Sequence, residues 1–271
     1  MTIEQQISEL VTDGHKPTID FLGLAIDDLG DREAAAAIAA RPEAAPFAYV
    51  VTPNAQHLVS LSRDEGVWRE VYSQAWMRLC DGRIVQPLAR LLFGLRLPYA
   101  SGSDLTLRLV TDHIGPDDRI TVIGGGAVVE QALRQRFGWT ALSVFDPPFG
   151  LLTDSRAQQA CLDFLRAHPA RYVFFTVGSP QSELLALQAR RSGQLTGIGL
   201  CVGSSLLFAT GLVKRAPVLF QKLGIESLYR LGQRPRSHLR RIFIDSLPVV
   251  LLLARARWAG ARILPMTEKD K

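Results

Sequence analysis

The sequence predicts an α/β protein in which a mostly parallel β-sheet carries helices on both faces. Short apolar runs of strand length alternate with longer stretches of helical periodicity over most of the chain, a pattern typical of parallel sheets with crossover helices. Several runs are almost continuously apolar, as expected for strands that are buried on both faces. Between Arg119 and Phe145, a strand, a glycine turn, a helix and a second strand follow one another as in a βαβ unit.

The expected strands are short, rich in β-branched and aromatic residues, and bounded by turn residues. Lys16–Asp27 is expected to form an early strand or one arm of a hairpin. The later strands are expected at Phe47–Thr52, Met77–Cys80, Arg119–Ile123, Thr140–Phe145, Arg171–Val177 and Leu195–Val202. Pro53 ends the first of these later strands, because proline cannot donate a hydrogen bond to a sheet.

The expected helices lie between these strands, and several begin at a residue that can cap a helix N-terminus. The first three are expected after Asp31 (through Ala40), after Asn54 (through Leu61) and after Asp64 or Glu65 (through Trp76). The later ones are expected at Arg83–Gly94, from Ser103 or Asp104 through Val110, at Ala127–Phe137, Ser155–His168 and Gln181–Arg191, and after Ser205.

Charge divides the chain into a mildly acidic body and a basic C-terminal region. The whole chain of 271 residues has a formal net charge of +5, but Lys214–Arg262 alone holds eleven basic residues against Glu226 and Asp245. A chain of this length suits one large α/β domain with a small appendage. We therefore expect one domain over residues 1–213 and a basic, amphipathic helical appendage over residues 214–271.

The basic appendage contains apolar stretches, but none of them is long enough to predict a transmembrane helix. Its longest unbroken apolar run, Leu247–Ala254, has eight residues, whereas a span needs about 20. Basic and bulky apolar residues together can bind the headgroup region of an anionic leaflet. A helix that packs on the core and exposes its arginines to solvent explains the composition equally well. Nucleic-acid binding is not expected, because no recognition motif accompanies the charge.

The first residues of the chain predict a cytoplasmic protein, and the cysteines are expected to be reduced. Residues Met1–Lys16 lack the basic start and apolar core of a secretory signal. Cys80, Cys161 and Cys201 are widely spaced among apolar neighbours, so buried reduced thiols are expected rather than disulfides or zinc ligands.

Several clusters of polar residues lie where an expected strand ends or an expected helix begins. We expect the loops that carry these clusters to form one site together. Asp81 is the carboxylate best placed for a general base, because it ends a strand between apolar flanks; an ordinary Asp-Gly turn is the alternative. Thr52 and Asn54 can bind a sugar or hold Asp81, although Asn54 is equally suited to cap a helix. His57 is expected to pack rather than react.

Glycine-containing turns at strand ends indicate phosphate binding. Gly124-Gly125-Gly126 precedes a helix N-terminus, where a backbone can approach a phosphate, but Val129 replaces the third glycine of a dinucleotide fingerprint. Gly178-Ser179-Pro180 and Gly203-Ser204-Ser205 are similar turns. No metal-binding motif is visible, so basic groups would have to neutralise a diphosphate. The candidates are Arg215, Arg230, Arg236, Arg240 and Arg241.

Taken together, motifs spread over about Asp20–Ile244 resemble the WecG/TagA/CpsF family of bacterial glycosyltransferases. In chain order they are Thr52-Pro53-Asn54, Asp81-Gly82, Gly102-Ser103-Asp104-Leu105, Val122-Ile123-Gly124-Gly125, Gly178-Ser179-Pro180 with Glu183, Arg215-Ala216-Pro217, and Gln221–Glu226 with Leu228–Leu231, Pro235-Arg236 and Arg240-Arg241. Each motif alone is weakly specific, but their common order is a strong signal.

The resemblance implies a Rossmann-like sheet and an inverting transfer that needs neither metal nor cofactor. A sugar would move from a UDP-sugar to a polyprenyl-diphosphate-linked saccharide during synthesis of exopolysaccharide or another surface polysaccharide. The enzyme would bind peripherally to the anionic cytoplasmic face of the bacterial inner membrane. Members of the family can self-associate, but this sequence shows no interface.

The resemblance also implies roles for the residues that match the motifs. Asp81 would be the catalytic base, with Thr52 and Asn54 beside it, and the appendage would supply arginines and membrane contact. Substrate contacts are expected at Gly102, Ser103, Asp104, Gly124, Gly125, Gly178, Pro180, Gln181, Glu183, Arg215, Arg230, Arg236, Arg240 and Arg241.

Three departures from the family pattern leave the donor sugar open. Gln181-Ser182-Glu183 follows Pro180 where the family commonly has Lys-Gln-Glu, an arginine is absent from Leu97–Ser101, and an aspartate is absent from Gly203–Gly211. An N-acetylmannosamine-type donor, a glucose-type donor and another hexose are therefore all compatible. Two alternatives to a glycosyltransferase stay open. The chain could be a non-catalytic protein that binds lipid or nucleotide sugar in a polysaccharide assembly complex, or it could be a nicotinamide-dependent oxidoreductase.

Overall fold

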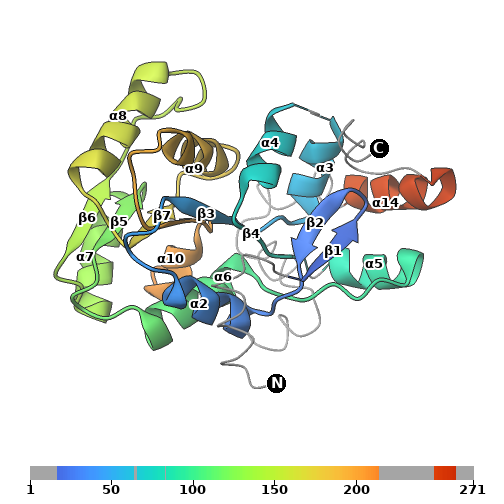
Figure 1. The fold of residues 1–271 in the computed structure, drawn as a ribbon, viewed down its shortest axis with the longest axis horizontal. Helices are drawn as coiled ribbons and strands as arrows, with labels where there is room; N and C mark the ends of the chain where they lie inside the picture. Colours follow the sequence, from blue (N-terminus) through green and yellow to red (C-terminus); the bar gives the residue numbers. More distant parts are fainter. Residues whose placement is uncertain (1–16, 64–65, 83, 214–246, 261–271) are drawn as a thin grey trace.

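The computed structural model describes residues 17–63, 66–82, 84–213 and 247–260. Within these residues, six parallel strands form a central sheet in the order β4-β3-β8-β7-β5-β6 (Figure 1). The strands are β3 (Ala48–Val51), β4 (Met77–Arg78), β5 (Ile120–Ile123), β6 (Leu142–Phe145), β7 (Tyr172–Phe175) and β8 (Ile198–Cys201). The predicted α/β class with a parallel sheet is confirmed.

Helices cover both faces of this sheet. One layer contains α3 (Ala55–Arg63), α4 (Val67–Gln74), α5 (Val85–Phe93), α8 (Ser155–Ala167), α9 (Gln181–Arg191) and α14 (Leu247–Ala259). The other contains α2 (Asp31–Ala40), α6 (Gly102–Arg108), the π-helix η1 (Leu109–His113), α7 (Gly126–Phe137) and α10 (Ser205–Ala209). Successive strand residues point to opposite layers, so Phe174 and Phe175 belong to different core clusters.

An N-terminal hairpin lies beside α5 and α14 at one end of the molecule (Figure 1). It consists of β1 (Thr18–Phe21) and β2 (Leu24–Asp27), which pair antiparallel. Asp27 attaches the hairpin to the sheet, because its carboxylate accepts a hydrogen bond of 2.5 Å from the backbone N–H of Arg78 in β4. The expected early strand is therefore a complete hairpin.

Two helix starts differ from the prediction. Gly30, not Asp31, occupies the N-cap position of α2, and the Asp31 carboxylate instead accepts a hydrogen bond of 2.8 Å from Arg108 Nε. Helix α6 begins at Gly102 because Ser101 caps it, accepting a hydrogen bond from the backbone N–H of Asp104. The start expected at Ser103 or Asp104 is therefore slightly late. Residues 64 and 65, expected to start α4, lie outside the described residues.

Helix α14 is the described part of the predicted appendage. Its side chains Val249 and Leu253 are fully buried and belong to the same core cluster as α3 and α5. Residues 214–246 and 261–271 lie outside the described residues, and the expected start of the appendage at Lys214 lies there too. In the part of the chain that the structure describes, no helix is both long and apolar enough to cross a membrane.

Candidate active site

The candidate active site lies at the edge of the sheet where all the strands end. Because the strands of the central sheet are parallel, the loops that follow them meet at this edge. Helices α7 and α9 follow the neighbouring strands β5 and β7 but belong to opposite layers. The loops after β5 and β7 therefore run to opposite faces of the sheet and leave a crevice between them at the carboxyl ends of the strands. Open α/β sheets bind ligands in such crevices.

Asp81 is held at this edge by two neighbouring loops. Its backbone N–H donates to the Pro53 carbonyl at 3.0 Å, and its Oδ2 accepts from the backbone N–H of Gly102 at 3.4 Å. A Cβ on Gly102 would lie 3.1 Å from Thr52 Oγ1, so the Thr52 side chain packs closely against Gly102. The structure thus brings Thr52, Asp81 and Gly102 together, and Asp81 is only half-buried.

Asn54 and His57 form a reciprocal cap at the start of α3. Asn54 Oδ1 accepts from the backbone N–H groups of Gln56 and His57 at 3.0 and 3.4 Å, which confirms the predicted helix cap. In return, His57 Nδ1 accepts from the backbone N–H of Asn54 at 3.1 Å. The arrangement corresponds to a capping box in which histidine replaces the usual Glu or Gln. The Asn54 side chain is therefore oriented by the helix that it starts.

His57 also reaches the loop after β7. Its Nε2 lies 2.9 Å from Ser179 Oγ and 3.5 Å from Glu183 Oε1. His57 and Glu183 are buried, whereas Ser179 is exposed. The sequence predicted that His57 packs rather than reacts, and it placed Ser179 in the Gly178-Ser179-Pro180 turn without giving its side chain a role. The spacing Asn54-x-x-His57 is a local signal for the cap, but no local signal indicates the contact with Ser179.

The residues of α6 contribute both to the site and to the helix itself. Asp104 Oδ2 accepts a hydrogen bond of 2.6 Å from Ser101 Oγ, so this carboxylate belongs to the start of α6. Ser103 Oγ lies 3.4 Å from Ser205 Oγ, which links α6 to the loop after β8. Ser205 enters the site only because β8 lies next to β3 in the sheet.

The Gly124 turn is fitted closely against the loop after β7. Gly124 has a φ of +104°, and a Cβ at this position would lie 2.6 Å from Thr176 Oγ1. Tight packing therefore requires glycine here whether or not a phosphate binds. Gly125, with a φ of +88°, is the N-cap residue of α7. Pro180 precedes α9, and the buried Oε1 of Gln181 has no hydrogen-bond partner among the described residues.

The buried neighbour of Asp81 has a strongly shifted acidity. Burial, and secondarily the negative charge of Asp81, raises the pKa of the Cys80 thiol from 9.0 to about 12. Cys161 and Cys201 are buried as well, and all three cysteines are free thiols, as expected. Because a thiolate is the reactive form of cysteine, none of these thiols is suited to be a nucleophile at neutral pH.

All five of the arginines expected to bind phosphate lie outside the described residues: Arg215, Arg230, Arg236, Arg240 and Arg241. Within the described ranges, no cluster of three or more His, Cys, Asp or Glu side chains could hold a metal ion. The described cations that come from the appendage are Arg255 and Arg257, both exposed on α14.

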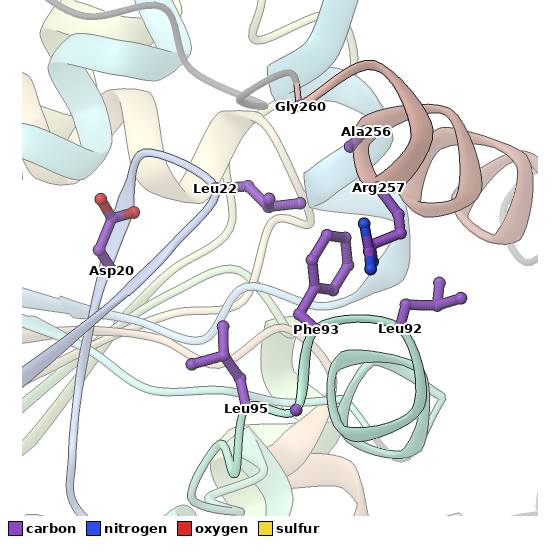
Figure 2. Close-up of a pocket in the computed structure, with 9 residues that line it drawn as sticks. Asp20, Leu22, Leu92, Phe93, Leu95, Ala256, Arg257 and Gly260 are labelled. Atoms are coloured by element: carbon purple, nitrogen blue, oxygen red, sulfur yellow. The ribbon is translucent and has the colours of Figure 1, made fainter.

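A separate cavity of about 660 Å³ lies between the hairpin, the C-terminal end of α5 and α14. Figure 2 shows Leu22, Phe93 and Leu95 around it, with Arg257 reaching in from α14 beside Phe93. Helix α5 starts shortly after Asp81 and has nine residues, so it separates the site from the cavity by about 13 Å at 1.5 Å per residue. One helix thus joins Asp81 to a cavity whose walls include both apolar side chains and the charged residues Asp20 and Arg257.

Comparison with known protein families gives one match over most of the chain. A model described as the glycosyl transferase WecG/TagA/CpsF family matches residues 19–263. The match includes every strand of the described sheet, the loops that hold Thr52, Asp81 and Gly102, and α14.

Proposed function

This chain belongs to the WecG/TagA/CpsF family of glycosyltransferases, and we propose that it transfers a hexose or N-acetylhexosamine-type sugar from a UDP-sugar to a polyprenyl-diphosphate-linked saccharide. Glycosyltransferases of this family act in the synthesis of cell-surface polysaccharides. The observation that carries the proposal is the position of Asp81, a half-buried carboxylate between Thr52 and Gly102 at the carboxyl edge of the sheet.

Asp81 is proposed as the general base of an inverting transfer. Its carboxylate would take the proton of the acceptor hydroxyl while that oxygen bonds to the sugar anomeric carbon and the bond from this carbon to UDP breaks. The Gly102 N–H holds one carboxylate oxygen at 3.4 Å, so the orientation of Asp81 is set before substrate binds. Thr52 and Asn54 are proposed to contact the sugar or the acceptor beside it.

The donor is proposed to bind along the loops after β5 and β7. The Gly124, Gly125 and Gly178 turns would face its diphosphate, with Pro180 and Gln181 at the start of α9 and Ser103 and Asp104 on α6 completing the walls. The buried Oε1 of Gln181, which has no hydrogen-bond partner among the described residues, supports this arrangement, because such an acceptor gains from a donor on a ligand. The leaving diphosphate would be neutralised without metal by arginines of residues 214–271.

The acceptor lipid is proposed to approach from the end of the molecule where α5 and α14 pack together. The outer surface there carries large exposed apolar side chains, Leu91, Leu251 and Trp258, which are 79, 53 and 90 % exposed. Arg255 and Arg257 lie on the same helix as the last two. Apolar and basic groups together suit peripheral binding to an anionic leaflet, here the cytoplasmic face of the inner membrane.

The test of the proposed function is UDP release from a panel of UDP-sugars, with and without short-chain polyprenyl-diphosphate-linked acceptors. Asp81→Asn keeps an oxygen that can accept the Gly102 hydrogen bond but cannot take a proton. We expect acceptor-dependent release to fall by about 10² or more, as for loss of a general base. Asp163→Asn is the matched control, because this carboxylate is 61 % exposed on α8.

Each result of this experiment separates the alternatives. Acceptor-dependent release that is lost in Asp81→Asn identifies the donor and the base together. Equal release by the wild type and Asp81→Asn would disprove the role of Asp81 and leave the transferase intact. Binding of a UDP-sugar by the wild type without transfer to any acceptor would instead favour the non-catalytic member of an assembly complex.

A further inference from the structure

The contacts of His57 determine which of its ring nitrogens carries the proton. The backbone N–H of Asn54 points at Nδ1 from 3.1 Å, and a backbone N–H can only donate. Nδ1 is therefore the unprotonated nitrogen, and the proton of the neutral ring is on Nε2. This Nε2–H group faces Ser179 Oγ at 2.9 Å and Glu183 Oε1 at 3.5 Å.

The imidazole is held in this orientation from several sides. The His57 ring packs edge-to-face on Trp68, with 6.0 Å between the ring centroids. Glu183 is only 5 % exposed, and its Oε1 lies on the Nε2 side of the ring. A buried carboxylate next to an N–H group favours the tautomer that places the proton there. His57 thus presents a fixed donor to the loop after β7.

Ser179 receives this donor with its oxygen, which leaves its own hydroxyl proton free to be donated elsewhere. A serine hydroxyl has one donor and two acceptor positions. Ser179 is exposed at the carboxyl edge of the sheet, and among the described residues its hydroxyl is hydrogen-bonded to His57. Accepting a hydrogen bond also makes a hydroxyl a better donor.

We propose that Ser179 is a substrate-binding residue that donates its hydroxyl proton to an oxygen of the UDP-sugar, and that His57 and Glu183 are the positioning residues that orient it. The inference rests on the proposed function. It assigns Glu183 a buried role behind the loop instead of a direct contact with sugar. The ligand atom must be an acceptor, either a diphosphate oxygen or a sugar oxygen.

The first test is the affinity of Ser179→Ala for UDP and for UDP-glucose, UDP-galactose, UDP-N-acetylglucosamine and UDP-N-acetylmannosamine, measured by calorimetry. We expect Kd to rise about 3- to 10-fold if the lost bond goes to a neutral sugar oxygen, and about tenfold or more if it goes to phosphate. Weaker binding of UDP itself identifies the diphosphate, whereas weaker binding of UDP-sugars alone identifies the sugar. Ser73→Ala, another exposed serine that bonds its own helix, is the control.

The second test uses two substitutions of His57 to distinguish the role of Nε2 as a donor from the role of Nδ1 as an acceptor. Asn in place of His57 keeps an acceptor near the position of Nδ1 but removes the donor to Ser179, while Gln keeps a donor near the position of Nε2. We expect His57→Asn to weaken binding as much as Ser179→Ala, and His57→Gln to retain most of the affinity. The double variant His57→Asn/Ser179→Ala should bind no more weakly than Ser179→Ala, since both changes remove one hydrogen-bond chain.

The outcomes distinguish this inference from the proposed function. If the wild type binds neither UDP nor any of the UDP-sugars, the proposed function fails and the inference fails with it. If the wild type binds and Ser179→Ala binds equally well, the inference alone is wrong. Additive effects of the His57 and Ser179 changes on Kd would show that His57 affects binding independently of Ser179, which would contradict the inference.

Discussion

At the scale of single residues, the loop after β4 places two neighbours in different environments. Cys80 is 3 % exposed and belongs to the core, whereas Asp81 is half-buried at the edge of the sheet. Leu79 and Cys80 continue the buried chain beyond β4, and Asp81 is the first residue after them that is partly exposed. A carboxylate at this position is close enough to the apolar interior to affect the thiol, yet open to a substrate.

The raised pKa of Cys80 predicts that stability falls at alkaline pH. The folded thiol keeps its proton up to about pH 12, whereas the unfolded thiol loses it near 9.0. The native state therefore binds more protons in this window, and stability is complete below pH 9.0 and decreases above it. The expected loss is about 1 kcal/mol per pH unit. Urea unfolding of the wild type and Cys80→Ala between pH 8 and about 11 measures it; equal slopes would contradict the assignment.

At the scale of elements, α14 is both a core helix and a surface helix. Its buried residues Val249, Leu253 and Ala256 follow a helical stripe, and they face α3 and α5. Its opposite side exposes Leu251 and Trp258. Apolar residues thus occupy both sides of the helix, which explains why composition alone left core packing and membrane binding as equal interpretations.

Two leucines of α14 provide a matched test of this packing. Leu253 is fully buried and Leu251 is 53 % exposed. We expect Leu253→Ala to lower the free energy of unfolding by about 2 to 5 kcal/mol, because it removes buried methyl groups and leaves a cavity. Leu251→Ala should change it by less than about 0.5 kcal/mol. Urea unfolding followed by circular dichroism gives both values, and similar losses would mean that α14 does not pack as described.

At the scale of the whole molecule, the site and the cavity lie at the two ends of α5. Asp81 precedes this helix, and Leu92 and Phe93 at its last turn line the cavity. The hairpin and α14 complete the cavity wall (Figure 2). Asp20 and Arg257 give the cavity charged as well as apolar walls, so α5 links the Asp81 loop to a surface of mixed polarity.

Membrane binding is best tested by point substitutions, because removal of α14 would also remove buried core residues. Trp258→Glu is expected to reduce pelleting with anionic liposomes by about tenfold or more, since it replaces an apolar anchor with a like charge. Val128→Glu on α7 is the control, because Val128 is 67 % exposed and α7 belongs to the opposite layer. Equal pelleting of the two variants would assign the α14 surface to another contact.

Local patterns predicted the elements well and their contacts poorly. The helix Gln181–Arg191 has the predicted bounds, and the βαβ unit around Gly124–Gly126 is confirmed. The start of α6 was misplaced because Ser101, Ser103 and Asp104 are all plausible caps, and only backbone geometry distinguishes them. Phosphate binding by the arginines of residues 214–246 stays a prediction, because these residues lie outside the described part of the chain.

The sequence by itself determined the fold class, the order of strands and helices, and the placement of Asn54 and Asp81 after strands; Thr52, expected as the last residue of a strand, follows β3 in the structure. These features depend on periodicity and turn residues, which act over a few neighbouring positions. Only the tertiary structure decided that β8 lies between β3 and β7, and that His57 meets Ser179, 122 positions further along the chain. Such pairings arise from the packing of whole layers, so no local pattern specifies them.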